Sequence, residues 1–141
     1  MSRTDEFREL LTAYDGTVRE LIRKKRPFEG LLGFGRRAAD EPCHEELDAR
    51  IEALCKAAGE EEDAAGLAEL TEAVLKAERR WEGPEYARLM LAAAQRHTLE
   101  LIPRLDPADR SRLADWYARE YPRRKRLPVQ DKILDTLKGK A

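Results

Sequence analysis

The side chains best able to do chemistry in this 141-residue chain are its two histidines and two cysteines. Cys43 and His44 are neighbours, and His97 is the other histidine. Thiolate and imidazole are common metal ligands, but adjacent residues of a helix point about 100° apart. A site that combined Cys43, His44 and His97 would therefore need a carboxylate from elsewhere. We expect His97 instead to lie at the edge of the core with a hydrogen-bond partner, and we assign no metal ligand and no cofactor.

The sequence has few residues in patterns typical of covalent catalysis or of phosphate binding. The two serines, Ser2 and Ser111, do not stand in a G-x-S-x-G turn. The glycines at positions 30, 33 and 35 match neither G-x-G-x-x-G nor the P-loop pattern. Carboxylates are abundant, but in a chain with 39% charged residues most are expected on solvated helix faces. The sequence assigns no catalytic residue and leaves open whether the protein is an enzyme.

The segment 24–41 lacks helical periodicity and holds three glycines among four large apolar side chains. We expect a long glycine-containing loop here, and loops of this length are often functional. Its apolar side chains either pack beneath the loop or face a partner. The candidate partner-binding residues of this segment are Phe28, Leu31, Leu32, Phe34, Arg36 and Arg37.

The densest charge feature is a run of four cations, Arg123, Arg124, Lys125 and Arg126. Adjacent cations repel one another, so an anionic neighbour is expected. That neighbour is an acidic helix of the same chain, solvent ions or an external partner. A helix-turn-helix interpretation would make 128–137 the recognition helix, where two acidic residues are unfavourable near phosphates. These four residues are the second group of candidate partner-binding residues.

The net charge of −1 hides a strong segregation of charge. Residues 19–37 carry a net charge of +5, residues 40–85 carry −10, and residues 117–141 carry +5. Two interpretations remain open: either the basic ends fold against the acidic helices, or they form a basic surface for an anionic partner.

The elements that must position these residues are helices. Apolar residues recur at spacings of three and four, and prolines suit the first positions of three helices. We predict a single domain, 1–141, that is an all-α antiparallel bundle of five or six helices with a long glycine-containing loop after the first helix. The expected helices run from Thr4 or Asp5 to about Arg23, from Pro42 to before Gly59, from Ala64 to Trp81, from Pro84 to before Pro103, from Pro107 to about Glu120, and from Pro128 to Leu137.

The spacing also predicts which side chains face inward and which residues cap helices. Gly59 is expected to end the second helix, acidic residues 60–63 to precede the third, and Asp106 to cap the fifth. The expected inward residues of the later helices include Leu47, Ile51, Leu54, Cys55, Ala58, Leu67, Leu70, Val74, Leu113, Trp116, Tyr117, Val129, Ile133, Leu134 and Leu137.

The sequence favours a non-catalytic helical interaction or regulatory module in the cytoplasm, with reduced cysteines. Its expected partner is another protein, including a second copy of itself in a homodimer, and no membrane. A nucleic-acid-binding protein that uses the basic cluster is the first alternative, and a small metal-binding helical bundle is the second. The first residues lack signal-peptide features, and the longest apolar run, 89–94, is too short to span a bilayer.

Overall fold

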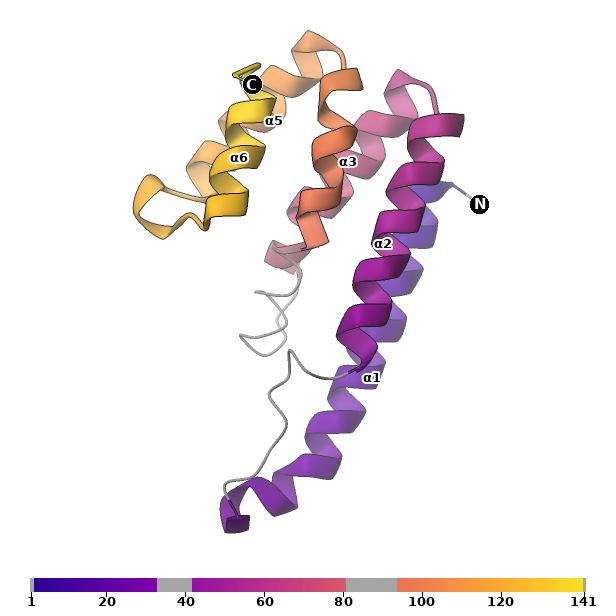
Figure 1. The fold of residues 1–141 in the computed structure, drawn as a ribbon, viewed down its shortest axis with the longest axis vertical. Coiled ribbons are helices and arrows are strands. Elements are labelled where there is room, and N and C mark those ends of the chain that lie inside the picture. The colour runs from indigo at the N-terminus through magenta and orange to yellow at the C-terminus, as the bar shows by residue number, and fades with distance from the viewer. Residues whose placement is uncertain (1, 33–41, 81–93, 141) are drawn as a thin grey trace.

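The computed structural model of the chain describes the backbone of residues 2–32, 42–80 and 94–140, and the side chains of residues 2–17, 20, 45–77 and 94–140. Within these ranges every regular element is helical, which confirms the predicted all-α bundle (Figure 1). The α-helices are α1 (Arg3–Leu32), α2 (Pro42–Glu61), α3 (Ala64–Arg80), α5 (Pro107–Glu120) and α6 (Pro128–Leu137). Short 3-10 segments are η2 (Gln95–Glu100), η3 (Ile102–Arg104) and η4 (Arg123–Lys125).

The helices form two groups joined through the segment 94–106. Helix α1 packs against α2 and α3, while α5 pairs with α6 (Figure 1). The 3-10 segment η2 contacts α2, α3 and α6 and so connects the two groups. The N-terminus lies at the side of α1 and α2, and the C-terminus lies beside α5 and α6 on the other side of the molecule (Figure 1).

One continuous apolar core holds the bundle together. The largest fully buried side chains come from all five described α-helices and from the segment 95–102, so these elements contribute apolar area to the same interior. The predicted inward residues of α2 and α3 are buried wherever the structure describes them, while Trp81, also predicted to face inward from the third helix, lies outside the described residues. Those of α5 and α6 are buried as well, apart from Trp116 and Val129, which are partly buried at the edge of the core. The fully buried anchors are Phe7, Ile51, Leu70, Leu75, Leu101, Ile102, Leu113, Tyr117 and Ile133.

Helices α5 and α6 begin and end where the sequence predicts. In both, a proline occupies the first turn, where no backbone N–H is needed and φ is already helical. The N–H of Leu127 donates to Oε1 of the buried Gln130 at 3.0 Å, which satisfies one backbone donor at the start of α6. Helix α5 differs in one respect: Asp106 has extended backbone angles at the N-cap position, but its side chain makes no capping hydrogen bond.

Two helices extend beyond their predicted ends. Helix α1 continues to Leu32, nine residues past Arg23, although it includes Pro27, which has no backbone N–H to donate. Helix α2 continues through Gly59 to Glu61, so the predicted C-cap at Gly59 is wrong. The carbonyl oxygen of Gly59 accepts a hydrogen bond from Nη1 of Arg104, a tertiary contact that no local pattern reveals.

The predicted fourth helix lies partly outside the described residues, which resume at Ala94. From there the chain is tighter than an α-helix, with 3-10 bonds such as Leu101 N–H to the Thr98 oxygen at 2.9 Å. The buried Gln95 holds this segment against α3, because its Nε2 donates to the Val74 oxygen at 3.3 Å and the Leu75 oxygen at 3.1 Å. The chain leaves the segment at Leu105, which is extended.

The acidic connection between α2 and α3 acts as expected. The N–H of Gly66 donates to Oδ1 of Asp63 at 2.8 Å, which caps the first turn of α3. Among the described helices, none is long and apolar enough to cross a membrane.

Candidate functional site

The connection between α5 and α6 carries the predicted cluster of four cations. Tyr121 ends α5, Pro122 opens the 3-10 turn η4, and Arg126 and Leu127 return the chain in extended conformation to α6. The N–H of Lys125 donates to the Pro122 oxygen at 2.8 Å, which closes the turn. We call residues 121–127 the basic turn.

The structure separates Arg126 from the other three cations. Its Nε donates to Oδ1 of Asp131 at 2.7 Å, and its Nη1 donates to the Tyr121 carbonyl oxygen at 3.0 Å. The side chain is only 13% exposed. Arg126 therefore joins the two ends of the basic turn and has little guanidinium surface left for a partner.

The side chains of Arg123, Arg124 and Lys125 are exposed and make no hydrogen bond or ion pair with any described residue. Beside them, Leu127 is 36% exposed and is the one exposed large apolar side chain among those the structure describes. The basic turn thus combines three cations without partners with an apolar side chain that water solvates poorly. The three cationic side chains and Leu127 are thus accessible together at one turn.

The acidic helices obtain their counter-charges from elsewhere in the chain. Within the described residues, no basic side chain of 117–140 pairs with an acidic residue of 40–85. Among the described residues, the C-terminal basic segment therefore makes no direct ion pair with the acidic helices. The pairs that do form with these helices across the bundle are Arg3 with Glu61, Arg96 with Asp48, and Arg112 with Glu72.

Glu72 lies at the centre of one such cluster, between α3 and α5. Its Oε1 accepts hydrogen bonds from Lys76 Nζ at 2.6 Å and Arg112 Nη1 at 3.0 Å. Burial alone would raise the pKa of Glu72, but the two cationic donors outweigh it and the pKa is lowered. Lys76 also lies over the ring of Trp116, 5.1 Å from its centroid, so the cluster is a structural joint between α3 and α5.

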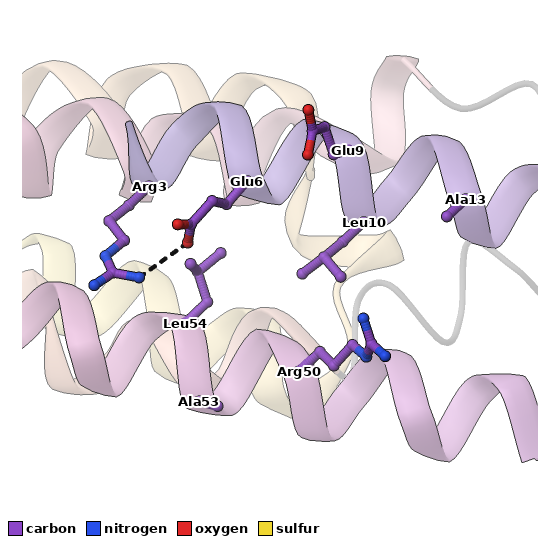
Figure 2. A pocket seen from close by; sticks show the side chains of 8 residues that line it. All are labelled: Arg3, Glu6, Glu9, Leu10, Ala13, Arg50, Ala53 and Leu54. Carbon is purple, nitrogen blue, oxygen red and sulfur yellow. Dashed lines mark hydrogen bonds and ion pairs between the residues drawn. The ribbon is translucent and has the colours of Figure 1, made fainter. Parts of the chain in front are cut away.

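A second surface feature is an open groove of about 610 Å³ between α1 and α2 (Figure 2). Helix α1 contributes Arg3, Glu6, Glu9, Leu10 and Ala13, and helix α2 contributes Arg50, Ala53 and Leu54. Leu10 and Leu54 point toward each other between the two helices, and charged side chains lie around them (Figure 2). We call this surface the α1–α2 groove.

The residues singled out for metal chemistry have other roles or lie outside the described side chains. His97 Nε2 lies 3.0 Å from Oδ1 of Asp48, and its side chain is 11% exposed. This confirms the prediction of a core-edge histidine with a hydrogen-bond partner. Arg96 Nη2 donates to the other carboxylate oxygen at 2.7 Å, so Asp48 ties η2 to α2. The side chains of Cys43 and His44 are outside the described residues, among which no three His, Cys, Asp or Glu gather as metal ligands.

Cys55 is buried on α2 as a free thiol. Burial, with a smaller contribution from the charge of Glu100, raises the pKa of this thiol to about 12. The reactive thiolate is thus a minor species at neutral pH, and Cys55 behaves as a small apolar core residue.

The structure describes only part of the glycine-containing segment, 24–41. The backbone of Phe28, Leu31 and Leu32 belongs to α1 rather than to a loop, while their side chains are outside the described residues. Phe34, Arg36 and Arg37 lie outside the described residues altogether. Of the two predicted groups of partner-binding residues, the structure therefore describes the side chains of the second alone, in which Arg123, Arg124 and Lys125 are exposed and Arg126 is 13% exposed.

Sequence reasoning missed three features. Leu127 was placed in no site, although its position beside four cations could have drawn attention to it. The α1–α2 groove and the position of Asp48 depend on how distant helices pack, which no local pattern reports.

No protein-family model matches the chain, and neither the curated proteins nor the solved structures include a match.

Proposed function

We propose that this protein is a non-catalytic interaction module whose basic turn binds an acidic segment of a partner protein. The observation that carries the proposal is the exposure of Arg123, Arg124 and Lys125, without partners, beside the exposed Leu127. Three adjacent cations attract a run of carboxylates, and Leu127 offers an apolar contact at the same place.

The basic turn is already held in shape before any partner arrives. Arg126 ties it to Asp131 and to the Tyr121 carbonyl, and Gln130 holds the N–H of Leu127. Prolines at positions 122 and 128 restrict the backbone on both sides. A preorganised turn loses less conformational entropy on binding, so a short contact surface is sufficient for measurable affinity.

An acidic protein segment fits this surface better than a nucleic acid does. Three free cations neutralise about three phosphates, which corresponds to a log–log salt slope of only about −2.7 on duplex DNA. Asp135, on the adjoining α6, would repel a phosphate backbone that continues past the basic turn, whereas a short acidic segment ends before it. Leu127 gains from an apolar side chain of a peptide and gains nothing from phosphates.

The test is a fluorescence-anisotropy titration of a labelled peptide in which glutamate alternates with leucine. The triple variant R123Q/R124Q/K125Q removes three exposed ion pairs worth about 0.5 kcal/mol each, so the Kd should rise about tenfold. Leu127→Ser should also weaken binding. Arg119→Gln is the matched control, because Arg119 is exposed on α5 with no partner among the described residues, and its Kd should match that of the wild type.

The same titration with duplex DNA decides between the two classes of partner. We expect weaker binding to the duplex than to the peptide, with a shallow salt dependence. Equal peptide affinity for the wild type and the triple variant would contradict the proposal. Tighter binding to the duplex with a steep salt slope would replace it with a nucleic-acid-binding function.

A further inference from the structure

The α1–α2 groove is independent of the basic turn. Figure 1 places α1 and α2 at one side of the molecule and the connection between α5 and α6 at the opposite side. A contact at the groove therefore leaves Arg123, Arg124 and Lys125 open.

Two charged residues of the α1–α2 groove are free to form further ion pairs with a neighbouring molecule. Glu9 is exposed and makes no hydrogen bond or ion pair with any described residue. Arg50 uses one nitrogen, Nη2, to reach Glu46 Oε1 at 3.0 Å, and both side chains of this pair are more than 60% exposed. By contrast, Arg3 and Glu6 pair with each other at 3.0 Å, and Arg3 also pairs with Glu61. Glu9 and Arg50 are therefore the charges that the groove can offer to a neighbour.

We propose that the α1–α2 groove is the interface between two copies of this chain in a symmetric dimer. Arg50 on α2 lies at the same level along the helices as Leu10, the residue after Glu9 on α1 (Figure 2). A two-fold axis parallel to the helices places α1 of one copy over α2 of the other at an unchanged level. Glu9 of each copy then faces Arg50 of the other, so the surface is complementary to itself, as a two-fold interface requires.

The shape of the groove agrees with close contact between helices. Ala13 and Ala53 are exposed and small, so they allow the backbone of a neighbouring helix to come near. Leu10 is half-buried and Leu54 is 6% exposed, so they form an apolar floor that the second copy removes further from water. The four helices from two copies then make a four-helix contact with charges on its rim.

The experiment is sedimentation equilibrium on the untagged protein over a wide range of concentrations, with charge-reversed variants. We expect a reversible equilibrium between a 16.2 kDa monomer and a dimer. In E9R or R50E, two attractive contacts become repulsive, and the dimer Kd should rise about 30-fold, which is about 2 kcal/mol. An equimolar mixture of E9R and R50E should regain the dimer, because each variant then meets the opposite charge on the other.

The controls separate loss of the interface from loss of the fold. Glu52→Arg reverses an exposed carboxylate of α2 outside the groove and should leave the dimer Kd unchanged. If a charge-reversed variant melts earlier by circular dichroism, E9Q and R50Q take its place, with a smaller rise in Kd. A monomer at every concentration, or a dimer that neither reversal weakens, would overturn the proposal.

Discussion

Replacing Arg126 with glutamine tests whether this residue holds the basic turn or binds the partner. The substitution removes the bond of Nε to Asp131 at 2.7 Å and the bond of Nη1 to the Tyr121 oxygen at 3.0 Å. The bond to the carboxylate is worth about 1 kcal/mol, since Asp131 is 54% exposed while Arg126 is 13% exposed. The charged bond to the carbonyl contributes about 1 kcal/mol more.

We therefore expect Arg126→Gln to lower the free energy of unfolding by about 2 kcal/mol, and Tm by about 8 °C in a chain of this size. The assay is urea unfolding followed by circular dichroism, with Arg124→Gln as the matched control. Arg124 is exposed and without partners, so its substitution should change the free energy by less than about 0.5 kcal/mol. Equal losses in the two variants would refute the role assigned to Arg126. A double-mutant cycle with Asp131→Asn should show a coupling of about 0.5–1 kcal/mol.

Two further stability predictions follow from the core and the helices. Gly16→Ala should raise the free energy of unfolding by about 0.5–1 kcal/mol, because Gly16 lies inside α1 and an added Cβ meets no atom within 4 Å; thermal melts measure this, and a destabilised variant would contradict it. Glu72→Gln should destabilise the fold at neutral pH and matter less in acid. The folded-state pKa of Glu72 lies below its ordinary value of 4.5, so its contribution is complete above that pH and is lost as the pH falls through the folded pKa. The urea midpoints of the wild type and of Glu72→Gln should converge as the pH falls through the folded-state pKa of Glu72. A difference that stays constant with pH would contradict the stabilising role assigned to the Glu72 carboxylate.

The elements that the sequence predicted well are those whose ends are fixed locally. Helices α5 and α6 have the predicted bounds because Pro107 and Pro128 define their first turns. The end of α2 could not be predicted in the same way. There, Arg104 reaches the carbonyl of Gly59 from 45 residues away, and a glycine that usually ends a helix lies inside one.

The candidate site was predictable in outline and not in detail. Four consecutive cations mark 123–126 as a charged surface in any fold. Their division into three exposed residues and one that closes the turn depends on Asp131, on the Tyr121 carbonyl and on how α5 and α6 pack. The α1–α2 groove was beyond local patterns, because Glu9 and Arg50 are 41 positions apart and only the packing of α1 on α2 brings them to one surface.

The most direct test of the central claim, that the basic turn binds an acidic segment, is an NMR titration of isotope-labelled protein with the glutamate–leucine peptide. We expect the backbone amide signals of residues 123–127 to shift in a saturable manner, while those of the α1–α2 groove stay in place. The triple variant R123Q/R124Q/K125Q should show much smaller shifts at the same peptide concentrations. Saturable shifts confined to another surface, or none in 123–127, would contradict the claim.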